Sequence, residues 1–359
     1  MRILFLSLPN MGGCQRVTVN YAKILAQSGY KCHFLFWVDK LNDENEVRNL
    51  LPAEITYDQL CCRLRELPMA LYKYIRKHGG FDCVFSSWLT FNLSLCISKC
   101  LPFNKIGHLV LRDDNMPSRH GQKYIKAYRM LGNKADIMIA QTQEMMNEFA
   151  TVYHLRKNTI VVSNPMDKAF IQGCVEEGIR NGLVLEGSPV YIASGRINPQ
   201  KDYLTLVKAY NKVLEKQPQA LLYILGAEGL DSDYGKEVKK EIVALVLENK
   251  VRFLGFQNNP FQYIHAADVF VLSSIYEGLP NVMIEAIYIG TPVAATTCIP
   301  YIGQTVKEGE SGYTAEPQNP EQLAKAMMNA SSLPKRALGV DVNESEEQII
   351  QLFRKILTK

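Results

Sequence analysis

The sequence predicts two α/β domains, each built on a parallel β-sheet that is covered by helices on both faces. Short runs of β-branched and apolar residues alternate with longer amphipathic stretches, and the chain goes through this alternation twice. Its 359 residues are too many for one ordinary domain. Because apolar strands joined by crossover helices form parallel sheets, we expect each domain to be Rossmann-like.

We expect the first domain over residues 1–165, since the strand signal stops at Asn164-Pro165. Helical patterns lie between most of its strands, and two of them, 63–78 and 119–134, are basic. The six expected strands are "RILFLS" (2–7), "CHFLFWV" (32–38), "DCVFSS" (82–87), "GHLVLR" (107–112), "DIMIAQ" (136–141) and "IVVSN" (160–164).

We expect the second domain over residues 166–340, and the poorly patterned stretch 172–188 is typical of a linker. Residues 341–359 carry a last helical pattern, which we expect to pack back on the first domain. The expected helices include 203–216, 280–289 and 321–330, and the five expected strands are "PVYIAS" (189–194), "LLYILG" (221–226), "VRFLGF" (251–256), "DVFVLSS" (268–274) and "PVAAT" (292–296).

The composition is that of an ordinary globular protein. Hydrophobic residues make up 47% of the chain and charged residues 21%, and no stretch is apolar enough to cross a membrane. The apolar run before Pro9 is too short for a secretory signal, so we expect a cytoplasmic location. The nine cysteines show no CxxC pair and no histidines at zinc spacing, which predicts free thiols rather than disulfides or a structural metal.

The two halves of the chain differ in charge. Residues 1–163 hold 21 Lys and Arg against 13 Asp and Glu, whereas residues 164–359 hold 19 against 23. In the basic stretches 63–78 and 119–134, Tyr, Leu and Met interleave with the cations, which suits an anionic membrane surface or an anionic lipid-linked substrate. The alternative is a solvated basic face on each helix. We expect peripheral contact with an anionic membrane surface and no nucleic-acid partner.

Three loops are candidates for ligand binding, because ligands of parallel sheets bind where strands end and helix N-termini offer unpaired N–H groups. In the first loop, Gly12 and Gly13 follow the strand that ends at Ser7 and leave room for a phosphate or a sugar. A tight turn alone would also explain this glycine pair.

The second candidate loop combines a strand end with two cations. Arg196 and Lys201 follow Gly195, and Asp202 suits the cap of the helix that starts at Tyr203. Two cations beside a helix N-terminus would hold a diphosphate and stabilise charge on a nucleotide leaving group.

The third candidate loop leads into "EGLPNVMIEA", where Glu277 precedes an apolar helix and Glu285 lies inside it. A buried carboxylate requires partners, because leaving it unpaired is costly, and ligand hydroxyls would serve. Glu277 and Glu285 therefore predict one binding site in which each carboxylate contacts a different part of a ligand. The alternative makes Glu277 a helix-dipole carboxylate and Glu285 the partner of a core Arg or Tyr.

Four segments, in this order, resemble the retaining glycosyltransferases of family 4. They are "PNMGGCQRVTVNYAKILAQSGYKC", "VVSNPMD", "ASGRINPQKDYLTLVKAY", and "EGLPNVMIEA" followed by "GTPVAAT", the last with the family's E-x7-E spacing. The resemblance covers nearly the whole chain. It implies the GT-B fold, in which two Rossmann-like domains face each other with the active site in the cleft between them.

The resemblance also implies roles for single residues. Arg196 and Lys201 would bind the diphosphate of a nucleotide-sugar, Glu277 would contact the donor sugar, and Glu285 would hold the ribose hydroxyls. The implied catalytic set is Arg196, Lys201 and Glu277. The other donor-binding candidates are Gly12, Gly13, Gly195, Gly278, Leu279, Pro280 and Asn281.

Two stretches depart from the family pattern. Residues 296–309 lack the glutamate that many relatives carry after the last donor strand, and residues 108–120 lack the usual histidine directly after a strand, with His120 downstream. We expect the second stretch to face the reacting sugars without a named base. The acceptor-side candidates are Arg16, Asn92, Arg112, Asp113, Asp114 and Asn115.

The resemblance implies a retaining transferase that uses no cofactor and no metal. The donor would be a hexose or N-acetylhexosamine linked to UDP, the favoured nucleotide, or to GDP. The acceptor would be a hydroxyl of a lipid-linked glycan in bacterial surface polysaccharide synthesis, at the cytoplasmic face of the inner membrane. Three alternatives remain. They are a sugar-nucleotide 2-epimerase, a non-catalytic sugar-nucleotide or glycan-binding protein, and a manganese-dependent transferase that uses Asp231 and Asp233, which we expect instead to form a polar surface turn.

Overall fold

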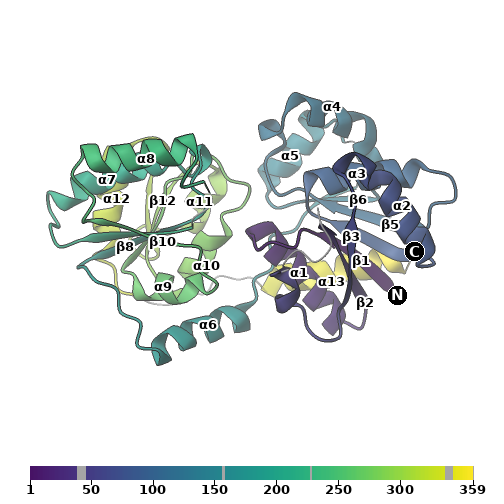
Figure 1. Ribbon diagram of the computed structural model, residues 1–359, viewed down its shortest axis with the longest axis horizontal. Coiled ribbons are helices and arrows are strands. Elements are labelled where there is room, and N and C mark those ends of the chain that lie inside the picture. Colours follow the sequence, from purple (N-terminus) through teal and green to yellow (C-terminus); the bar gives the residue numbers. More distant parts are fainter. Residues whose placement is uncertain (39–45, 156–157, 227–228, 336–342, 359) are drawn as a thin grey trace. The chain divides into compact units, whose positions relative to one another are not determined.

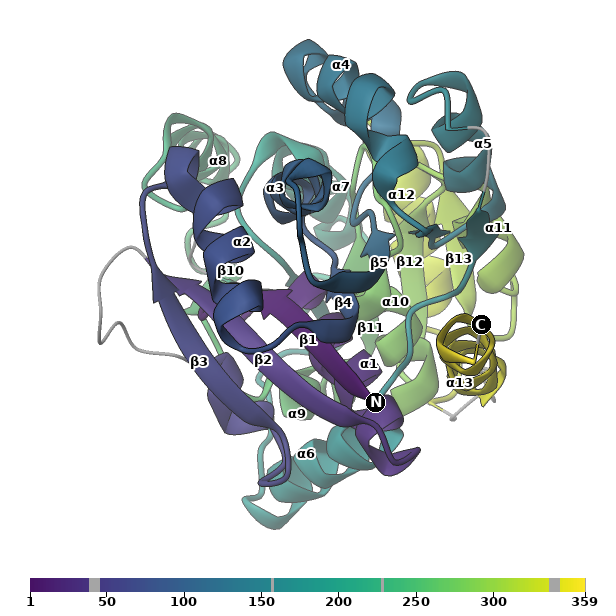
Figure 2. The same ribbon diagram turned by 90° about the vertical axis from the view of Figure 1, so that its right-hand side faces the viewer.

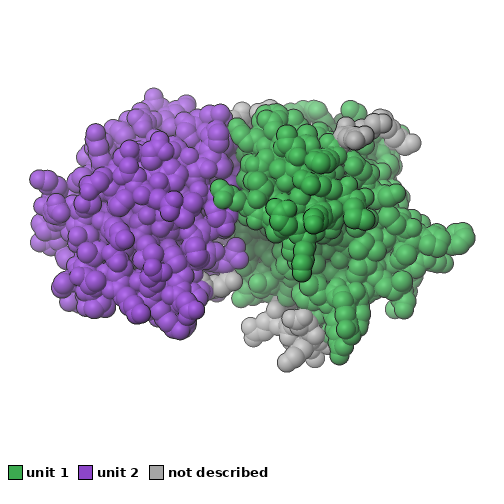
Figure 3. Space-filling view, turned by 90° about the horizontal axis from the view of Figure 1, so that it is seen from above, with its two compact units in different colours: residues 1–166, 341–359 green, residues 167–340 purple. Residues whose placement is uncertain are grey.

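The computed structural model describes residues 1–38, 46–155, 158–226, 229–335 and 343–358. It divides into two compact units (Figures 1 and 3). Unit 1 comprises Met1–Met166 with the C-terminal segment Asp341–Lys359, and unit 2 comprises Asp167–Val340. Each unit holds one sheet in which all pairings between strands are parallel, so the predicted pair of Rossmann-like sheets is confirmed.

Unit 1 is built on a seven-stranded sheet with the order β3-β2-β1-β4-β5-β6-β7. The order reverses between β1 and β4, so the carboxyl ends of these two strands form the switch point at which such sheets bind ligands. The ladder between them runs to Leu6 and Ser86. The strands are β1 (Arg2–Ser7), β2 (Lys31–Val38), β3 (Thr56–Cys61), β4 (Phe81–Ser86), β5 (Ile106–Arg112), β6 (Ile137–Ala140) and β7 (Thr159–Val161).

Helices cover both faces of the unit 1 sheet (Figure 2). Alternate strand residues pack in one core on each face. Ile3 and Phe5 pack in a core with α1 (Gly13–Gln27), η1 (Val47–Leu50) and α13 (Asn343–Leu357). Leu4 and Leu6 pack on the opposite face. The helices of that face are α2 (Leu67–Lys77), α3 (Leu89–Cys100), α4 (Gln122–Leu131) and α5 (Gln143–Thr151), and short 3-10 turns η2 (Leu64–Glu66), η3 (Pro117–Arg119) and η4 (Gly132–Lys134) adjoin them in the chain.

Unit 2 repeats this plan with a six-stranded sheet of order β10-β9-β8-β11-β12-β13. Its switch point lies between β8 and β11, whose ladder ends at Ile192 and Phe270. Both strands continue beyond that pair, to Ser194 and Leu272, so their carboxyl ends are not paired with each other. The strands are β8 (Val190–Ser194), β9 (Leu221–Leu225), β10 (Val251–Gly255), β11 (Val269–Leu272), β12 (Val293–Thr296) and β13 (Gly312–Ala315).

The unit 2 sheet also lies between two helical layers (Figure 1). The layer of α7 (Tyr203–Leu214), α8 (Asp233–Ala244) and α12 (Pro320–Ala330) packs its apolar side chains against alternate strand residues. Helices α9 (Pro260–Ala266) and α10 (Asn281–Ile289) cover the other face, with α6 (Lys168–Arg180) packed on both of them. The remaining helical elements are η5 (Pro199–Lys201) and α11 (Pro300–Thr305).

The structure corrects the sequence reading at several elements. The stretch 172–188 is not all linker, because α6 occupies its first half, capped by Asp167 and buried along Ile171 and Cys174. Strand β3 was not expected, since this edge strand is half exposed and rich in polar residues. Strand β13 was missed because "GYTA" is short and contains glycine. Helix α10 starts at Asn281, with Pro280 as its cap residue rather than its first turn.

Two expectations from composition concern the cysteines and membrane-spanning segments. All nine cysteines are free thiols, as predicted. Within the described ranges, no helix combines the length and the apolar character that spanning a bilayer requires.

Candidate functional site

The loop after β8 places Lys201 beside the unit 2 switch point. Gly195 has φ of 156°, and a Cβ there would lie 3.0 Å from Cε of Lys201. The side chain of Asn198 accepts a hydrogen bond from the Lys201 backbone N–H, which closes the turn η5. Asp202 then caps α7 by accepting from the Thr205 N–H, as the sequence predicts. The glycine therefore lets the lysine stem pass close to the backbone.

Lys201 and Glu277 meet across this switch point. The Lys201 Nζ donates to Glu277 Oε1 at 2.6 Å, and the Ser274 hydroxyl donates to the same oxygen at 2.6 Å. The side chains are 19% and 8% exposed, so water screens this pair little. A charge-assisted bond of this length fixes both groups at the carboxyl ends of β8 and β11.

Backbone bonds hold the surrounding loops together. The Ile275 N–H donates to the Gln200 carbonyl at 2.8 Å, and the Gln200 side chain donates to the Tyr276 carbonyl at 3.0 Å. The Thr296 hydroxyl, at the end of β12, donates to the Ser274 carbonyl at 2.6 Å. The ends of β8, β11 and β12 therefore form one connected polar region.

The second glutamate of the motif lies inside α10. Glu285 is buried among apolar neighbours, as the sequence predicts, and the helix ends at Gly290 with φ of 96°. Gly278, Leu279 and Pro280 are buried where the loop enters the helix, and Asn281 is its half-buried first residue. Arg196, by contrast, is exposed, and the structure gives it no contact with Glu277. Lys201 and Glu277 are thus the predicted donor residues that the structure brings together.

Two other titratable groups lie close to this pair. Burial raises the pKa of Cys298 to about 12, with Glu277 raising it further and Lys201 lowering it. Burial also raises the pKa of Tyr203, to which Glu277 contributes. Both groups therefore stay protonated at neutral pH.

The carboxylates of Asp231 and Asp233 are both exposed. Asp231 is paired with Lys239 at 3.0 Å and Asp233 with Lys236 at 3.5 Å. Asp231 lies in a polar surface turn, as the sequence predicts, whereas Asp233 is already the first residue of α8, which the hydroxyl of Ser232 caps.

The switch point of unit 1 is joined by side chains rather than by an ion pair. The Cys14 thiol donates to the Ser87 carbonyl at 3.1 Å, and the Thr18 and Ser87 hydroxyls lie 2.6 Å apart. Helix α1 begins at Gly13, as expected. Gly12 has φ of −166°, an extended conformation open to any residue, and a Cβ there would meet only the flexible Gln15 side chain. The backbone at Gly12 therefore does not require glycine.

Arg112 ends β5 as a fully buried cation. Its Nη2 donates to the Asn164 side chain at 2.5 Å, while Nε and Nη1 have no hydrogen-bond partner in the described structure. The Asn92 side chain donates to the Arg112 carbonyl at 2.8 Å. The Asn164 side chain in turn donates to the Gln141 side chain at 3.0 Å, and Gln141 donates to the Asp113 carbonyl at 2.8 Å. This network spans the carboxyl ends of β5, β6 and β7.

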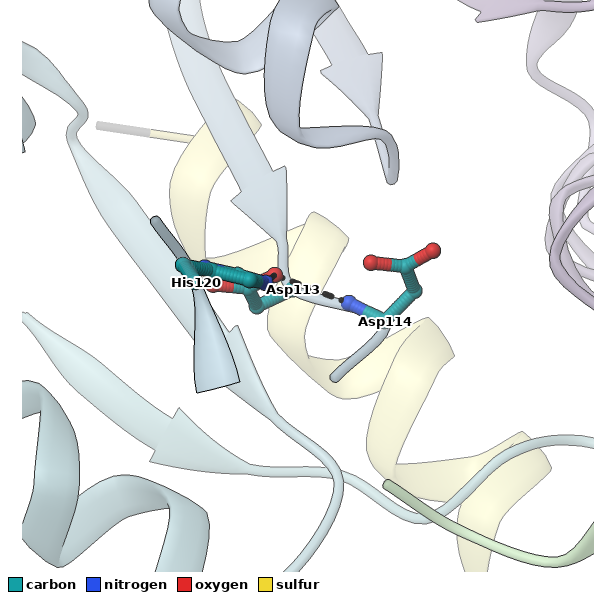
Figure 4. A group of neighbouring side chains, drawn as sticks. All are labelled: Asp113, Asp114 and His120. Atoms are coloured by element: carbon teal, nitrogen blue, oxygen red, sulfur yellow. Dashed lines mark hydrogen bonds and ion pairs between the residues drawn. The ribbon is translucent and has the colours of Figure 1, made fainter. Parts of the chain in front are cut away.

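Asp113 and Asp114, directly after β5, lie together with His120, which follows η3 (Figure 4). Their ligand atoms are within 4.8 Å of one another, a spacing that a metal ion could use. However, Asp113 already accepts from the Tyr153 hydroxyl at 2.9 Å and from the Asp114 N–H at 3.0 Å. His120 Nδ1 is bonded to the same Tyr153 hydroxyl. Because these atoms serve the protein's own contacts, we assign no metal to the group.

The two carboxyl groups titrate in an unusual range. Burial raises the pKa of Asp113 to about 7, and burial with the charge of Asp113 raises the pKa of Asp114 to about 6. Arg112 lowers both values. Burial lowers the pKa of His120. Carboxyl groups with pKa values near the working pH are a frequent feature of active sites.

The other acceptor-side candidates are less prominent. Asn115 is half-buried, and its side chain accepts from the Met116 N–H at 2.9 Å. Arg16 lies in the first turn of α1, half-buried, with its backbone N–H bonded to the Gly12 carbonyl. Sequence reasoning did not single out Ser274 or Tyr153. Ser274 is the last residue of the expected strand "DVFVLSS" (268–274), whereas Tyr153 carried no sequence signal, because its contact with Asp113 spans 40 residues.

Family models identify the chain's relatives. The model of glycosyl transferases group 1 matches residues 175–349, and the model of glycosyltransferase family 4 matches residues 11–170. The chain is a glycosyltransferase of this GT-B type. A solved Anabaena protein, in complex with UDP and glucose, has the same fold as this chain, with a TM-score of 0.78. The two sequences are 22% identical, and the comparison covers 99% of this chain and 100% of that one.

Two relatives show how far the sequence similarity extends. An uncharacterised glycosyltransferase of Methanocaldococcus jannaschii is 36% identical over 177 residues, 48% of this glycosyltransferase and 43% of that protein. The chain thus spans less than half the length of this relative. The N-acetylgalactosamine-N,N'-diacetylbacillosaminyl-diphospho-undecaprenol 4-alpha-N-acetylgalactosaminyltransferase of Campylobacter jejuni is 23% identical over 342 residues, 90% of this chain and 88% of that one.

Proposed function

We propose that the protein transfers a hexose or N-acetylhexosamine from a nucleotide-sugar to a glycan hydroxyl, with retention at the anomeric carbon. The observation that carries this proposal is the buried Lys201–Glu277 pair at the switch point of unit 2. A cation and a carboxylate held there suit a ligand that has a diphosphate at one end and sugar hydroxyls at the other. UDP is the favoured nucleotide, because the Anabaena protein of the same fold binds UDP, and GDP is the second choice.

In this proposal, the donor residues divide the ligand among them. Lys201 and the exposed Arg196 bind the diphosphate, Glu277 contacts the donor sugar, and Glu285 binds the ribose hydroxyls. The bond of 2.6 Å to Glu277 holds the Lys201 ammonium in a fixed position from which it can bind a diphosphate. Ser274 shares the Glu277 oxygen and keeps the carboxylate oriented after the lysine engages phosphate.

The proposed chemistry needs no enzymic nucleophile and no metal. The bond between the anomeric carbon and the diphosphate oxygen breaks while the acceptor oxygen bonds to the same face of that carbon. The hydroxyl proton passes to the departing diphosphate. Lys201 and Arg196 stabilise the charge that develops on this leaving group, which is the largest electrostatic contribution available in the site.

We propose a lipid-linked acceptor at a membrane surface, as in bacterial surface polysaccharide synthesis. The Campylobacter relative is named for a diphospho-undecaprenol substrate. Helix α2 exposes Met69, Lys73, Arg76 and Lys77, and α4 exposes further cations with Tyr124 and Met130. Exposed apolar side chains interleaved with cations suit an anionic bilayer.

The test is a thermal-shift and turnover screen against UDP, GDP, ADP and their common hexose and N-acetylhexosamine conjugates. We expect one nucleotide to raise the melting temperature of the wild type, and Glu285→Gln to lose that response. Glu237→Gln, an exposed glutamate of α8, is the matched control and should respond as the wild type does. Turnover in the presence of EDTA tests the metal independence. If no nucleotide shifts the wild type, the proposed function is wrong.

A further inference from the structure

We propose that Asp114 binds the reacting hydroxyl of the acceptor, and that Tyr153 and His120 hold Asp114 in place through Asp113. This inference rests on the proposed function and gives separate tasks to two neighbouring carboxylates. It also names Tyr153 as a positioning residue.

The hydrogen bonds of the loop leave Asp114 available for a ligand. Both oxygens of Asp113 are occupied, one by Tyr153 and the other by the Asp114 N–H. The Asn115 side chain is occupied by the Met116 N–H. The Asp114 carboxylate accepts no hydrogen bond from another residue of the described chain, although it is only half exposed to solvent. Its side chain stands apart from the overlapping Asp113 and His120 side chains in Figure 4.

Arg112 is an independent sign of a polar ligand near this carboxylate. Its guanidinium is 1% exposed and leaves Nε and Nη1 without partners, although burying an unsatisfied charged group is costly. Its positive charge lowers the pKa of Asp114 and so favours the ionised carboxylate. An ionised carboxylate accepts a hydrogen bond from a sugar hydroxyl, which is the contact that Asp114 leaves unused.

Tyr153 links Asp113 and His120 through hydrogen bonds to its hydroxyl group. Its hydroxyl donates to Asp113 Oδ2, so its oxygen must accept from His120, which places the neutral imidazole proton on Nδ1. The Tyr153 ring stacks on Tyr128 at 4.3 Å and on Phe149 at 5.9 Å. A hydroxyl held by two buried rings therefore fixes Asp113 from the side of α5.

Asp113 transmits this order to Asp114 through the backbone. Its Oδ1 accepts from the Asp114 N–H at 3.0 Å, and its own carbonyl accepts from Gln141. Its own N–H donates to the Ile139 carbonyl at 3.3 Å. Asp114 is therefore attached to a backbone that is bonded on both sides, and its carboxylate can present a fixed acceptor geometry to the incoming hydroxyl.

The experiment compares Asp114→Asn, Asp113→Asn, Tyr153→Phe and a control, Tyr128→Phe. Tyr128 is the matched control because it is stacked on Tyr153 but its hydroxyl is not bonded to Asp113. UDP release is measured from UDP-glucose and UDP-N-acetylglucosamine, with octyl β-glucoside as acceptor and with water alone. UDP binding and backbone hydrogen exchange over 113–121 are measured for each variant.

We expect Asp114→Asn to lower acceptor-dependent UDP release by about 100-fold, the size of effect that removal of one oriented polar contact has in other active sites, with UDP affinity unchanged. In the wild type, the rate of UDP release should fall as pH drops below about 6, where Asp114 becomes protonated, and Asp114→Asn should lose this dependence. The charged or titratable groups near this region are Arg112, Asp113, His120, Cys14 and Glu148. Tyr153→Phe should raise the acceptor KM more than it lowers kcat and speed exchange over 113–121. Tyr128→Phe should do neither.

The inference is overturned if Asp114→Asn releases UDP within threefold of the wild type, or if Tyr153→Phe exchanges no faster than Tyr128→Phe over 113–121. The hydrogen-exchange measurement needs no acceptor. If the wild type does not accept octyl β-glucoside as a substrate, UDP release by hydrolysis, with water as the acceptor, is compared instead. Absence of UDP binding by the wild type would instead contradict the proposed function, so the two failures are distinguishable.

Discussion

The switch points of the two units differ in the polar groups that join the strand ends, with an ion pair in unit 2 and neutral hydrogen-bonding groups in unit 1. In unit 2, the strand ladder stops at Ile192 and Phe270, and the cation and carboxylate at this point are bonded to each other. In unit 1, neutral groups join the strand ends, and the buried Tyr21, Ser86 and Arg112 keep polar atoms without partners in the described structure. Buried polar atoms without protein partners are rare, so each requires an explanation.

This difference suggests that the two units prepare for different ligands. Unit 2 pairs Lys201 with Glu277, which suits a donor of constant chemistry, and among the described residues it keeps a buried polar atom without a partner at Asp202 Oδ2. Unit 1 retains unused hydrogen-bonding capacity, which suits polar groups of an acceptor. The proposed division between a donor unit and an acceptor unit therefore has a physical counterpart in how completely each satisfies its own polar atoms.

The largest effect is expected where the pairing of unit 2 is broken. Lys201→Met leaves Glu277 buried beside Ser274 without its cation, and we expect a loss of about 3–5 kcal/mol in the free energy of unfolding of unit 2. Denaturant unfolding measures this loss. The double variant Lys201→Met with Glu277→Leu should recover most of it, and a cost below about 1 kcal/mol in the single variant would show that the pair is not effectively buried.

A comparable effect is expected from the C-terminal helix, but in unit 1. Phe353 is fully buried in the core that α13 shares with α1, and its ring lies 6.3 Å from that of Phe85. Phe353→Ala should cost about 3–5 kcal/mol through lost burial and the remaining cavity. Unfolding followed by hydrogen exchange should locate the loss in unit 1. Met130→Ala, at an exposed position, is the control, and a loss confined to unit 2 would contradict the assignment of α13.

The pH dependence of unit 1 should reflect its buried carboxyl group. The folded-state pKa of Asp113 is raised to about 7 from an ordinary value of 3.8, so the folded state binds the proton more tightly than the unfolded state does. The contribution of Asp113 to stability therefore falls as pH rises from about 4 to 7, by an amount on the order of 2–4 kcal/mol.

The stability difference between the wild type and Asp113→Asn, measured across this range, gives the slope due to Asp113 together with the part of the Asp114 pKa shift that the charge of Asp113 causes. His120 acts in the opposite sense, because its lowered pKa causes stability to be lost as pH falls below 6.5, but it is present in both proteins. A difference that does not change with pH would contradict the raised pKa of Asp113.

The smallest effect is expected at the donor loop of unit 2. Gly195→Ala introduces a Cβ at φ of 156°, 3.0 Å from the Lys201 stem, and should cost roughly 1 kcal/mol or more. Gly303→Ala is the control, because no atom lies within 4 Å of its added Cβ and α11 is helical. UDP affinity should fall in the first variant alone. Equal effects in both variants would show that the approach of Lys201 to Gly195 is unimportant.

The fold was largely predictable because buried parallel strands are continuous apolar runs. Sequence reasoning failed at β3 and β13, which are short or half exposed, and at α6, where glycines mask an apolar stripe. These elements owe their structure to tertiary contacts rather than to a strong local pattern.

The candidate site was predictable only where a motif names residues. Lys201 and Glu277 were each identified in the sequence, but their contact joins positions 76 residues apart and could not be inferred from spacing. Tyr153 and Asn164 were not singled out for the site, because their roles depend on side chains that β5, β6 and β7 bring together. Sequence reasoning thus named the residues of the proposed donor site and did not find the side chains that support the loop after β5.

The most direct test of the account is calorimetric titration of UDP into the full-length wild type, Glu285→Gln and Asp114→Asn. The account predicts that the wild type and Asp114→Asn bind UDP with equal affinity, because the nucleotide belongs to unit 2, and that Glu285→Gln binds at least about tenfold more weakly, a loss of 1.4 kcal/mol or more. Equal binding by all three proteins, or weakened binding only in Asp114→Asn, would contradict the assignment of the donor site to unit 2.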